Sequence, residues 1–261
     1  MSISSEERKR VILDRLRGEG QVRVAQLSER LSVSEETVRR DLILLEKAGR
    51  VKRVYGGAIP AGGGMYEPPY LQRQNTKTGE KQRIGRRAAE LIESGDTIAI
   101  DVGTTALELA KAIAGRERLT ILTHSIAAAY HLMESVNSGR FDGSIIVIGG
   151  DLNPRQQSLT GPLSESALSK FRVDKAFISV GGITDRRGLS DYDVRETEMS
   201  ALMIEAADQS IVLADDSKIG REAFAQIAPL HRVHTVVSNI AMPVEWDNQP
   251  SLGHLHWMVA K

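Results

Sequence analysis

Two patterns in this 261-residue sequence predict an α/β protein in two parts: an N-terminal winged helix-turn-helix joined to a larger, doubly wound, mostly parallel Rossmann-like domain. In the first sixty residues, three short helical patterns precede an alternating apolar and basic run that ends in a Gly-Gly pair. Beyond residue 80, near-continuous apolar runs alternate with helical patterns. This alternation is typical of parallel strands that helices cover on both faces.

The three N-terminal helices are predicted from their starts and their apolar stripes. Ser4 stands three residues before Glu7, which is the capping-box spacing, so the first helix is expected to begin there. The second is expected to run from about Arg23 to Leu31, with apolar residues three and four positions apart. A very short connection leads to Ser34, a good N-cap for the third helix, and Gly49 closes that helix.

The third helix has the features of a recognition helix that enters the major groove of DNA N-terminus first. Ser34 and Thr37 are short polar side chains at its start, and Arg39 and Arg40 lie away from its apolar stripe. Arginines in such positions reach guanines or phosphates. The run Val51–Ala58 alternates before a glycine turn, as the two strands of a wing would. The alternative is a charged three-helix bundle whose arginines are only solvated.

Composition limits the other possibilities. The net charge is zero, but residues 1–60 carry 13 basic and 9 acidic side chains, so a basic head precedes an acidic remainder. The absence of Cys excludes disulfides, thiolate zinc sites and a cysteine nucleophile. No apolar run approaches the ~20 residues that span a bilayer, and no secretory signal is visible, so we expect a cytoplasmic protein without membrane contact. The six His are scattered, and neither a metal site nor a cofactor is expected.

The expected domain boundaries are residues 1–59 for the DNA-binding domain, 60–79 for a linker and 80–261 for the α/β domain. The linker is predicted from three consecutive glycines, a Pro-Pro pair and a polar run up to Gly79. It would allow one domain to move relative to the other, and composition equally fits a plain spacer. The strand-like runs of the α/β domain are Thr97–Asp101, Leu119–Thr123, Ser144–Gly149, Lys175–Gly181, Ser210–Ala214 and Thr235–Ser238.

Polar residues collect where five of these runs end. The first such segment combines glycine, hydroxyls and the amides of a helix start, which together would cradle an anion. Each segment alone has ordinary loop composition, but the carboxyl ends of parallel strands meet at one edge, where ligands of such folds bind. The five segments are Asp101–Thr105, Thr123–Ser125, Gly149–Asp151, Gly181–Gly182 and Ala214–Lys218.

Residues 5–60 resemble the N-terminal domain of the DeoR family of bacterial transcription regulators. The resemblance rests on the S-x-x-T-V-R-R-D-L core from Ser34 to Leu42 and on the Y-G-G-A ending at Ala58, and it continues to about Asn239. It implies a repressor that binds operator DNA as a homodimer or homotetramer. The DNA-binding residues that it implies are Gln21, Arg23, Ser34, Glu35, Thr37, Arg39, Arg40, Lys52 and Arg53.

The same resemblance implies that the second domain is similar to sugar-phosphate isomerases and binds a phosphorylated sugar or a related metabolite. His124 stands where the family usually has Asn, and Ser200 stands where a basic residue is common, so the identity of the sugar does not carry over. The effector-binding residues that the resemblance implies are Asp101, Gly103, Thr104, Thr105, Thr123, Ser125, Gly149, Gly150, Glu196, Asp215 and Lys218.

An enzyme is the alternative hypothesis. A sugar-phosphate isomerase with a DNA-binding head would use Glu196, Asp215 or Lys218 as acid–base groups, and fold similarity alone does not exclude it. The sequence provides no independent catalytic constellation, neither a nucleophile elbow nor a P-loop. We therefore expect a regulator with no catalytic residues.

Overall fold

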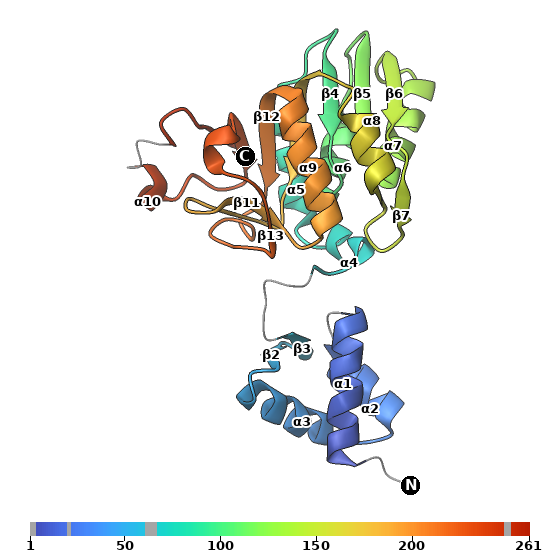
Figure 1. Cartoon of the computed structure of the whole chain (residues 1–261), viewed down its shortest axis with the longest axis vertical. Helices are drawn as coiled ribbons and strands as arrows, with labels where there is room; N and C mark the ends of the chain where they lie inside the picture. The colour runs from blue at the N-terminus through green and yellow to red at the C-terminus, as the bar shows by residue number, and fades with distance from the viewer. Residues whose placement is uncertain (1–3, 20–21, 61–66, 248–251) are drawn as a thin grey trace. The chain divides into compact units, whose positions relative to one another are not determined.

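The computed structural model describes residues 4–19, 22–60, 67–247 and 252–261. The chain divides into two compact units, Met1–Pro68 and Pro69–Lys261. We call them the head and the sensor unit, and each is described by itself (Figure 1).

The head is a winged helix-turn-helix, as predicted. Its elements are α1 (Ser5–Glu19), β1 (Val22–Arg23), α2 (Val24–Leu31), α3 (Glu35–Lys47), β2 (Val51–Val54) and β3 (Gly57–Pro60), with the strands in the order β1-β3-β2. Both predicted N-caps are present, because Ser4 Oγ accepts from Glu7 N at 3.3 Å and Ser34 Oγ accepts from Thr37 N at 3.2 Å. Arg23 differs from its prediction: it belongs to β1 and pairs with Gly57, so the second helix begins one residue later.

The three helices of the head enclose one apolar core that also includes the wing strands. Ile12, Leu27 and Val38, one from each helix, are completely buried in it. A buried ion pair also joins two of the helices, because Asp41 of α3 accepts a hydrogen bond from Arg8 Nε of α1 at 2.7 Å. The recognition helix is therefore held on its inner side by both packing and an ion pair, and its outer side remains available.

The sensor unit is built on a sheet of seven parallel strands in the order β15-β14-β12-β9-β4-β5-β6. Helices α8 and α9 cover one face, and α5, α6 and α7 cover the other (Figure 1). The elements up to the last of these helices are α4 (Tyr70–Gln74), α5 (Thr78–Ala89), β4 (Thr97–Ile100), α6 (Thr104–Ala112), β5 (Leu119–Thr123), α7 (Ile126–Asn137), β6 (Gly143–Val147), β7 (Asp151–Asn153), β8 (Ser158–Thr160), α8 (Pro162–Leu168), β9 (Val173–Ser179), β10 (Gly182–Thr184), β11 (Gly188–Asp191) and α9 (Val194–Ala206). The remaining elements are β12 (Ala207–Ala214), β13 (Ala225–Ala228), the 3₁₀ turn η1 (Leu230–Arg232), β14 (Thr235–Ser238), α10 (Val244–Asp247) and β15 (His256–Val259).

The doubly wound prediction is confirmed, and the central strands show why. Along β9, Ala176 and Ile178 pack into the core on one face while Phe177 packs into the core on the other. Both faces are apolar, so the strands read as continuous apolar runs. Beyond the six predicted strands, the sheet gains β15 at its edge. Two further small sheets, β7-β8 and β10-β11-β13, consist of short strands that lack such a run.

The predicted linker extends too far toward the C-terminus. Residues 61–66 lie outside the described residues, but α4 and the start of α5 occupy the second half of the 60–79 range. Tyr70 is 1% exposed, and its backbone N–H donates to the Arg155 carbonyl at 2.9 Å. The sensor unit therefore begins at Pro69 and not at Glu80, because this polar stretch packs against the unit's own loops. Within the described residues, no helix has the length and apolar character needed to cross a bilayer.

Candidate DNA interface and effector site

The exposed side of α3 and the turn of the wing border a common groove. Its lining includes Arg39 and Leu42 from α3 and Arg53 and Tyr55 from the wing. Ser34 Oγ and Thr37 Oγ1 lie 2.9 Å apart at the N-terminus of the helix. The structure thus brings Arg39 of the helix and Arg53 of the wing to one groove, while Gln21 lies outside the described residues.

The arginines of this groove are held by carboxylates of the head itself. Arg39 Nη2 lies 2.6 Å from Glu35 Oε2, and Arg53 Nε lies 2.9 Å from Glu46 Oε2. Hydrogen bonds from the Arg53 backbone and side chain lower the pKa of Glu46. Exposed pairs of this kind contribute little to stability, so another anion can replace the carboxylate at little cost.

Arg40 and Lys52 are further exposed basic side chains of the head. Arg40 Nε lies 3.5 Å from Glu36 Oε1, with both side chains mostly in solvent. Lys52 is exposed on β2, and Arg23 is exposed on β1. Tyr55 was not among the predicted DNA-binding residues, yet it is fully exposed at the turn between β2 and β3. The sequence indicated that Tyr55 is exposed, because an aromatic residue directly before a Gly-Gly turn cannot pack into the core.

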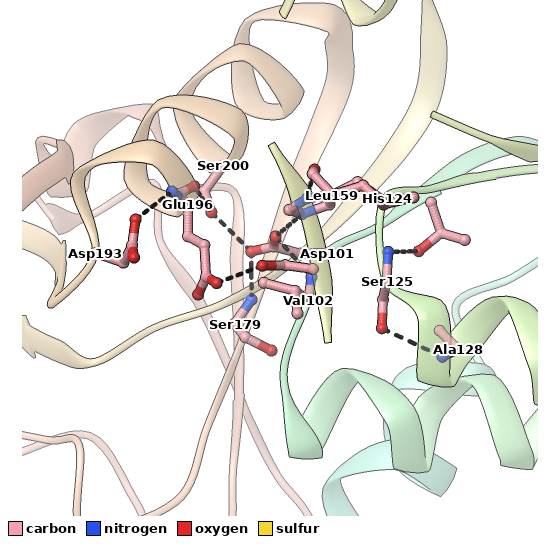
Figure 2. Close-up of polar contacts among 12 residues, drawn as sticks. Asp101, Val102, His124, Ser125, Ala128, Leu159, Ser179, Asp193, Glu196 and Ser200 are labelled. Carbon is pink, nitrogen blue, oxygen red and sulfur yellow. Dashed lines mark hydrogen bonds and ion pairs between the residues drawn. The ribbon is translucent and has the colours of Figure 1, made fainter. Parts of the chain in front are cut away.

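In the sensor unit, Asp101 at the end of β4 is the centre of a buried hydrogen-bond network that we call the Asp101 cluster (Figure 2). One carboxylate oxygen accepts from His124 Nε2 and from Val102 N, both at 2.8 Å. The other accepts from Ser200 Oγ at 2.9 Å and from Ser179 N at 3.2 Å. Four donors fill the usual capacity of a carboxylate, so Asp101 has no acceptor left for a sugar hydroxyl.

His124 is held in its charged form. Its Nδ1 lies 3.0 Å from the Leu159 carbonyl and its Nε2 lies 2.8 Å from Asp101 Oδ1, and both partners are acceptors. Both ring nitrogens therefore need a proton. Burial works against the charge, but the Asp101 carboxylate and the Leu159 carbonyl outweigh it and raise the pKa of His124. The two departures from the family pattern, His124 and Ser200, thus meet on the same carboxylate.

Several other predicted effector residues are used inside the fold. Thr123 Oγ1 accepts from Ser125 N at 3.1 Å, and Ser125 Oγ caps α7 by accepting from Ala128 N at 3.2 Å. Glu196 of α9 accepts from Ser158 Oγ at 2.6 Å and is 3% exposed. A Cβ at Gly150 would lie 1.9 Å from Ser164 Oγ, so that glycine is required by close packing against α8. The Gly149 carbonyl accepts from the same hydroxyl at 2.7 Å.

The start of α6 retains the features of an anion cradle. Gly103 has φ of +144°, and a Cβ there would lie 2.4 Å from Ser179 Oγ, so only glycine fits where the chain crosses the end of β9. Thr104 and Thr105 follow at the N-terminus of the helix. Ser179 Oγ is buried without a hydrogen-bond partner among the described residues.

A group of charged residues that we call the lysine cluster lies between the end of β12 and the start of α5. It contains Asp215 and Lys218, which were predicted, and Lys81, which was not. Burial lowers the pKa of Lys81 to about 8, although the nearby Asp215 carboxylate acts against burial and Lys218 adds to the decrease. Lys81 Nζ donates to the Arg73 carbonyl at 2.6 Å. Sequence reasoning missed Lys81 because its range looked like the end of a linker and the start of an amphipathic helix.

The lysine cluster is tied to the segment that follows the head. Lys77 Nζ contacts both carboxylate oxygens of Asp216 at 2.8 Å, and Arg73 Nη2 donates to Gln156 Oε1 at 2.6 Å. No group of His, Cys, Asp and Glu in the described ranges has the arrangement of a metal site.

Comparison with known proteins shows which family the chain belongs to. A model of the DeoR-like helix-turn-helix domain matches residues 8–61, and a model of the DeoR C terminal sensor domain matches residues 76–239. The chain belongs to the DeoR family. It is a DNA-binding transcription regulator, and no finding supports the enzyme alternative.

Relatives of this DeoR-family regulator align along nearly their whole length. The chain is 36% identical to the uncharacterized transcriptional regulator YulB of Bacillus subtilis, covering 89% of this chain and 88% of that one. It is 32% identical to the glycerol-3-phosphate regulon repressor of Escherichia coli, covering 91% and 92%. Among solved structures, the sorbitol operon regulator SorC of Klebsiella pneumoniae is similar with a TM-score of 0.40 at 14% identity, covering 89% of this chain and 96% of that one.

Proposed function

We propose that this DeoR-family regulator represses an operon for the use of a sugar or a carbohydrate derivative, and that a phosphorylated metabolite bound by the sensor unit releases it from DNA. The observation that carries the proposal is the pairing of a basic winged helix-turn-helix with a sensor unit in which Lys81 is buried near Asp215 and Lys218. Relatives named as repressors of the glycerol-3-phosphate regulon and of the aga operon support it.

On the DNA side, we assign phosphate and base contacts to Arg39, Arg40 and Arg53, with Ser34 and Thr37 at the N-terminus of the recognition helix. Lys52 and Arg23 add phosphate contacts, and Tyr55 extends the wing. Glu35 and Glu46 hold two of the arginines in place until phosphates replace them. Two copies of the chain would bind two symmetric half-sites, as helix-turn-helix regulators do.

On the effector side, we assign the phosphate to the amides of Gly103–Thr105 and to Lys218 and Lys81. A helix N-terminus favours an anion, and so do two ammonium groups, of which Lys81 is buried and Lys218 half-buried. Asp215 would accept hydroxyls of the sugar. Asp101 is a positioning residue in this scheme, because its four hydrogen bonds fix the strand end from which the Gly103–Thr105 loop leaves.

The proposed coupling runs through α4 and α5. Lys81, Lys77 and Arg73 belong to the segment that directly follows residues 61–68. Arg73 reaches the loop after β7 and Lys77 reaches the loop after β12 through their side chains, while Lys81 donates to the Arg73 carbonyl. An effector that contacts Lys81 would change the hydrogen bond by which Lys81 holds this segment. A coupling of only ~1–3 kcal/mol suffices to shift operator affinity by one to two orders of magnitude.

The test is binding of the purified protein to DNA from upstream of its own gene, titrated with sugar phosphates and with their unphosphorylated parents. Release by a phosphorylated compound, with its parent inactive, is the expected result. Tight DNA binding that no member of the panel affects would contradict the effector assignment and leave the head assignment intact. No binding even at low salt would contradict the assignment of the head.

A further inference from the structure

The hydroxyl of Tyr70, in the helix that opens the sensor unit, is buried without a hydrogen-bond partner among the described residues. The whole residue is 1% exposed, so the hydroxyl has no bulk water to bond instead. An unpaired buried hydroxyl is unfavourable, and a phenylalanine ring would fill the same space without a polar atom. The hydroxyl of Tyr70 therefore indicates a partner from outside the chain.

The side chain of Tyr70 lies beside the lysine cluster. The Arg73 guanidinium is 5.9 Å from the centroid of the Tyr70 ring, and the Arg73 carbonyl accepts from Lys81 Nζ at 2.6 Å. Burial raises the pKa of Tyr70 and lowers that of Lys81, and the Glu108 carboxylate acts on both groups by raising each pKa. Helix α4 packs against α6, on which Glu108 stands one turn after Thr104 of the anion cradle. Tyr70 is thus close to the proposed effector site.

Lys81 shows the same imbalance as Tyr70, but as a charge. Its ammonium is buried, and within the described part of the chain it donates to a carbonyl and not to a carboxylate. The nearby carboxylates of Asp215 and Glu108 do not offset burial, which lowers the pKa of Lys81 to about 8. Glu108 is also engaged elsewhere, 2.8 Å from Lys111 Nζ. A buried cation without a close counter-ion and a buried donor without an acceptor are both satisfied by one oxyanion.

We propose that Tyr70 is a specificity-determining residue of the effector site, where its hydroxyl donates a hydrogen bond to an oxygen of the effector's phosphate group. Because burial raises the pKa of Tyr70, the hydroxyl keeps its proton near neutral pH and acts as a donor. A phosphate oxygen fits this donor, since Arg73 and Lys81 place two positive charges beside it. A neutral sugar oxygen would leave the Lys81 ammonium without a counter-ion. The inference rests on the proposed function and adds a contact from α4.

The backbone of Tyr70 holds the ring in place before a ligand binds. Its N–H donates to the Arg155 carbonyl at 2.9 Å, which ties α4 to the loop after β7. A donor that is already ordered loses little side-chain freedom on binding. A buried donor also discriminates strongly against ligands that lack the matching acceptor, because it then stays unpaired. We therefore expect the unphosphorylated parent of the effector to gain nothing from Tyr70.

The first experiment is thermal unfolding of the full chain with and without inorganic phosphate. We compare the wild type, Tyr70→Phe, and the control Tyr130→Phe, which changes a 55% exposed tyrosine of α7. Without phosphate, Tyr70→Phe melts at the wild-type temperature or above it, because the substitution removes an unpaired polar group. Phosphate then raises the melting temperature of the wild type and the control more than that of Tyr70→Phe. A lower melting temperature of Tyr70→Phe without phosphate overturns the proposal, since it would show a partner inside the protein.

The second experiment is calorimetric titration with inorganic phosphate and with each sugar phosphate that releases the wild type from DNA. A hydrogen bond to a charged oxygen is at stake, so Tyr70→Phe should bind these ligands about tenfold to a hundredfold more weakly. The control Tyr130→Phe should bind them as the wild type does. Equal affinities in the wild type and Tyr70→Phe refute the contact. A loss of affinity for the sugar phosphate alone, with inorganic phosphate unaffected, refutes the assignment of the hydroxyl to the phosphate group.

Failure of this inference is distinguishable from failure of the proposed function. If one sugar phosphate concentration releases both the wild type and Tyr70→Phe from DNA, the regulator assignment stands and the Tyr70 contact is refuted. If no phosphorylated compound binds the wild type, the effector assignment itself is wrong, and the inference falls with it.

Discussion

In the head, Arg39 and Glu35 form an ion pair 2.6 Å apart while about half of each side chain remains in solvent. In the sensor unit, His124 and Asp101 lie 2.8 Å apart with both side chains essentially buried. The first pair exchanges its partner cheaply, because water and a DNA phosphate compete on equal terms with the carboxylate. The second pair does not exchange, because either charge left alone inside the protein is strongly unfavourable. Similar distances thus leave an arginine able to change partners in one unit and hold a buried strand end rigid in the other.

The largest expected difference comes from removing one carboxylate in each unit. Asp101→Ala leaves a buried imidazolium and two backbone N–H groups without acceptors, so we expect a loss of ~3–5 kcal/mol in the unfolding free energy of the sensor unit. Glu35→Ala in the head should cost at most ~1 kcal/mol. Urea denaturation of the two variants measures both values. Equal losses would show that the contrast between the units does not hold.

The lysine cluster should show the next largest effect. Lys218→Ala and Thr104→Ala are expected to leave operator affinity near that of the wild type and to abolish release by the effector, because the first removes a proposed ammonium contact with the phosphate and the second removes the hydroxyl beside the proposed amide contacts. A DNA-binding titration with effector measures both properties. Release of both variants at the wild-type effector concentration would show that the phosphate binds elsewhere.

The pH dependence of effector binding sharpens this prediction. Lys81 has a pKa of about 8, below its unfolded value of 10.5, and its charged form is the one that binds an anion. Effector affinity should therefore fall as the pH rises above 8, by up to about tenfold per pH unit. Calorimetry in two buffers of different ionisation enthalpy should also detect proton uptake on binding near pH 8. Lys81→Met should remove both effects.

Single substitutions in the head should change operator affinity by a moderate amount. Arg39→Ala or Arg40→Ala is expected to weaken operator binding by ~1–3 kcal/mol if it contacts a base, and to lower the slope of affinity against salt by about one if it contacts a phosphate. Effector binding should not change. Glu35→Gln is the matched control and should strengthen operator binding, because it frees Arg39 and removes a negative charge. Unchanged DNA affinity in both arginine variants would refute the recognition-helix assignment.

The smallest effect concerns His124. Its pKa in the folded protein is raised above the unfolded value of 6.5, so its contribution to stability is complete below about pH 6.5 and is lost as the pH rises through the folded pKa. Unfolding free energy measured from pH 6 upward should decrease over that range in the wild type. The slope should be smaller in His124→Gln, which keeps donors but cannot carry a charge.

The fold was predictable from the sequence wherever a segment carries its own signal. The continuous apolar runs of β5 and β14 were predicted with their bounds, because strands buried on both faces need such runs. The recognition helix was predictable from Ser34, whose capping role requires no distant partner. By contrast, β15 mixes His256 with apolar residues and depends on pairing with β14.

The candidate site was less predictable, because hydrogen-bond capacity is not visible in a sequence. Asp101 looked like a ligand and proves to be saturated by four donors, two of them from Ser200 and His124, which lie far apart along the chain. Lys81 looked like an ordinary surface lysine, and only the fold shows that burial beside Asp215 changes its pKa. The effector contacts themselves remain predictions.

The anchoring of α4 determines where this regulator can be divided. Tyr70, Arg73 and Lys77 bond to loops after β7 and β12, although in sequence they look like a spacer. A hybrid regulator joined at residue 80 would lose these side chains and inherit an incomplete sensor. One joined ahead of Pro69 would keep them all. The part that can be exchanged between regulators is therefore the head alone. A hybrid that is to respond to the same ligand at a different operator must keep the α4 segment with the sensor unit.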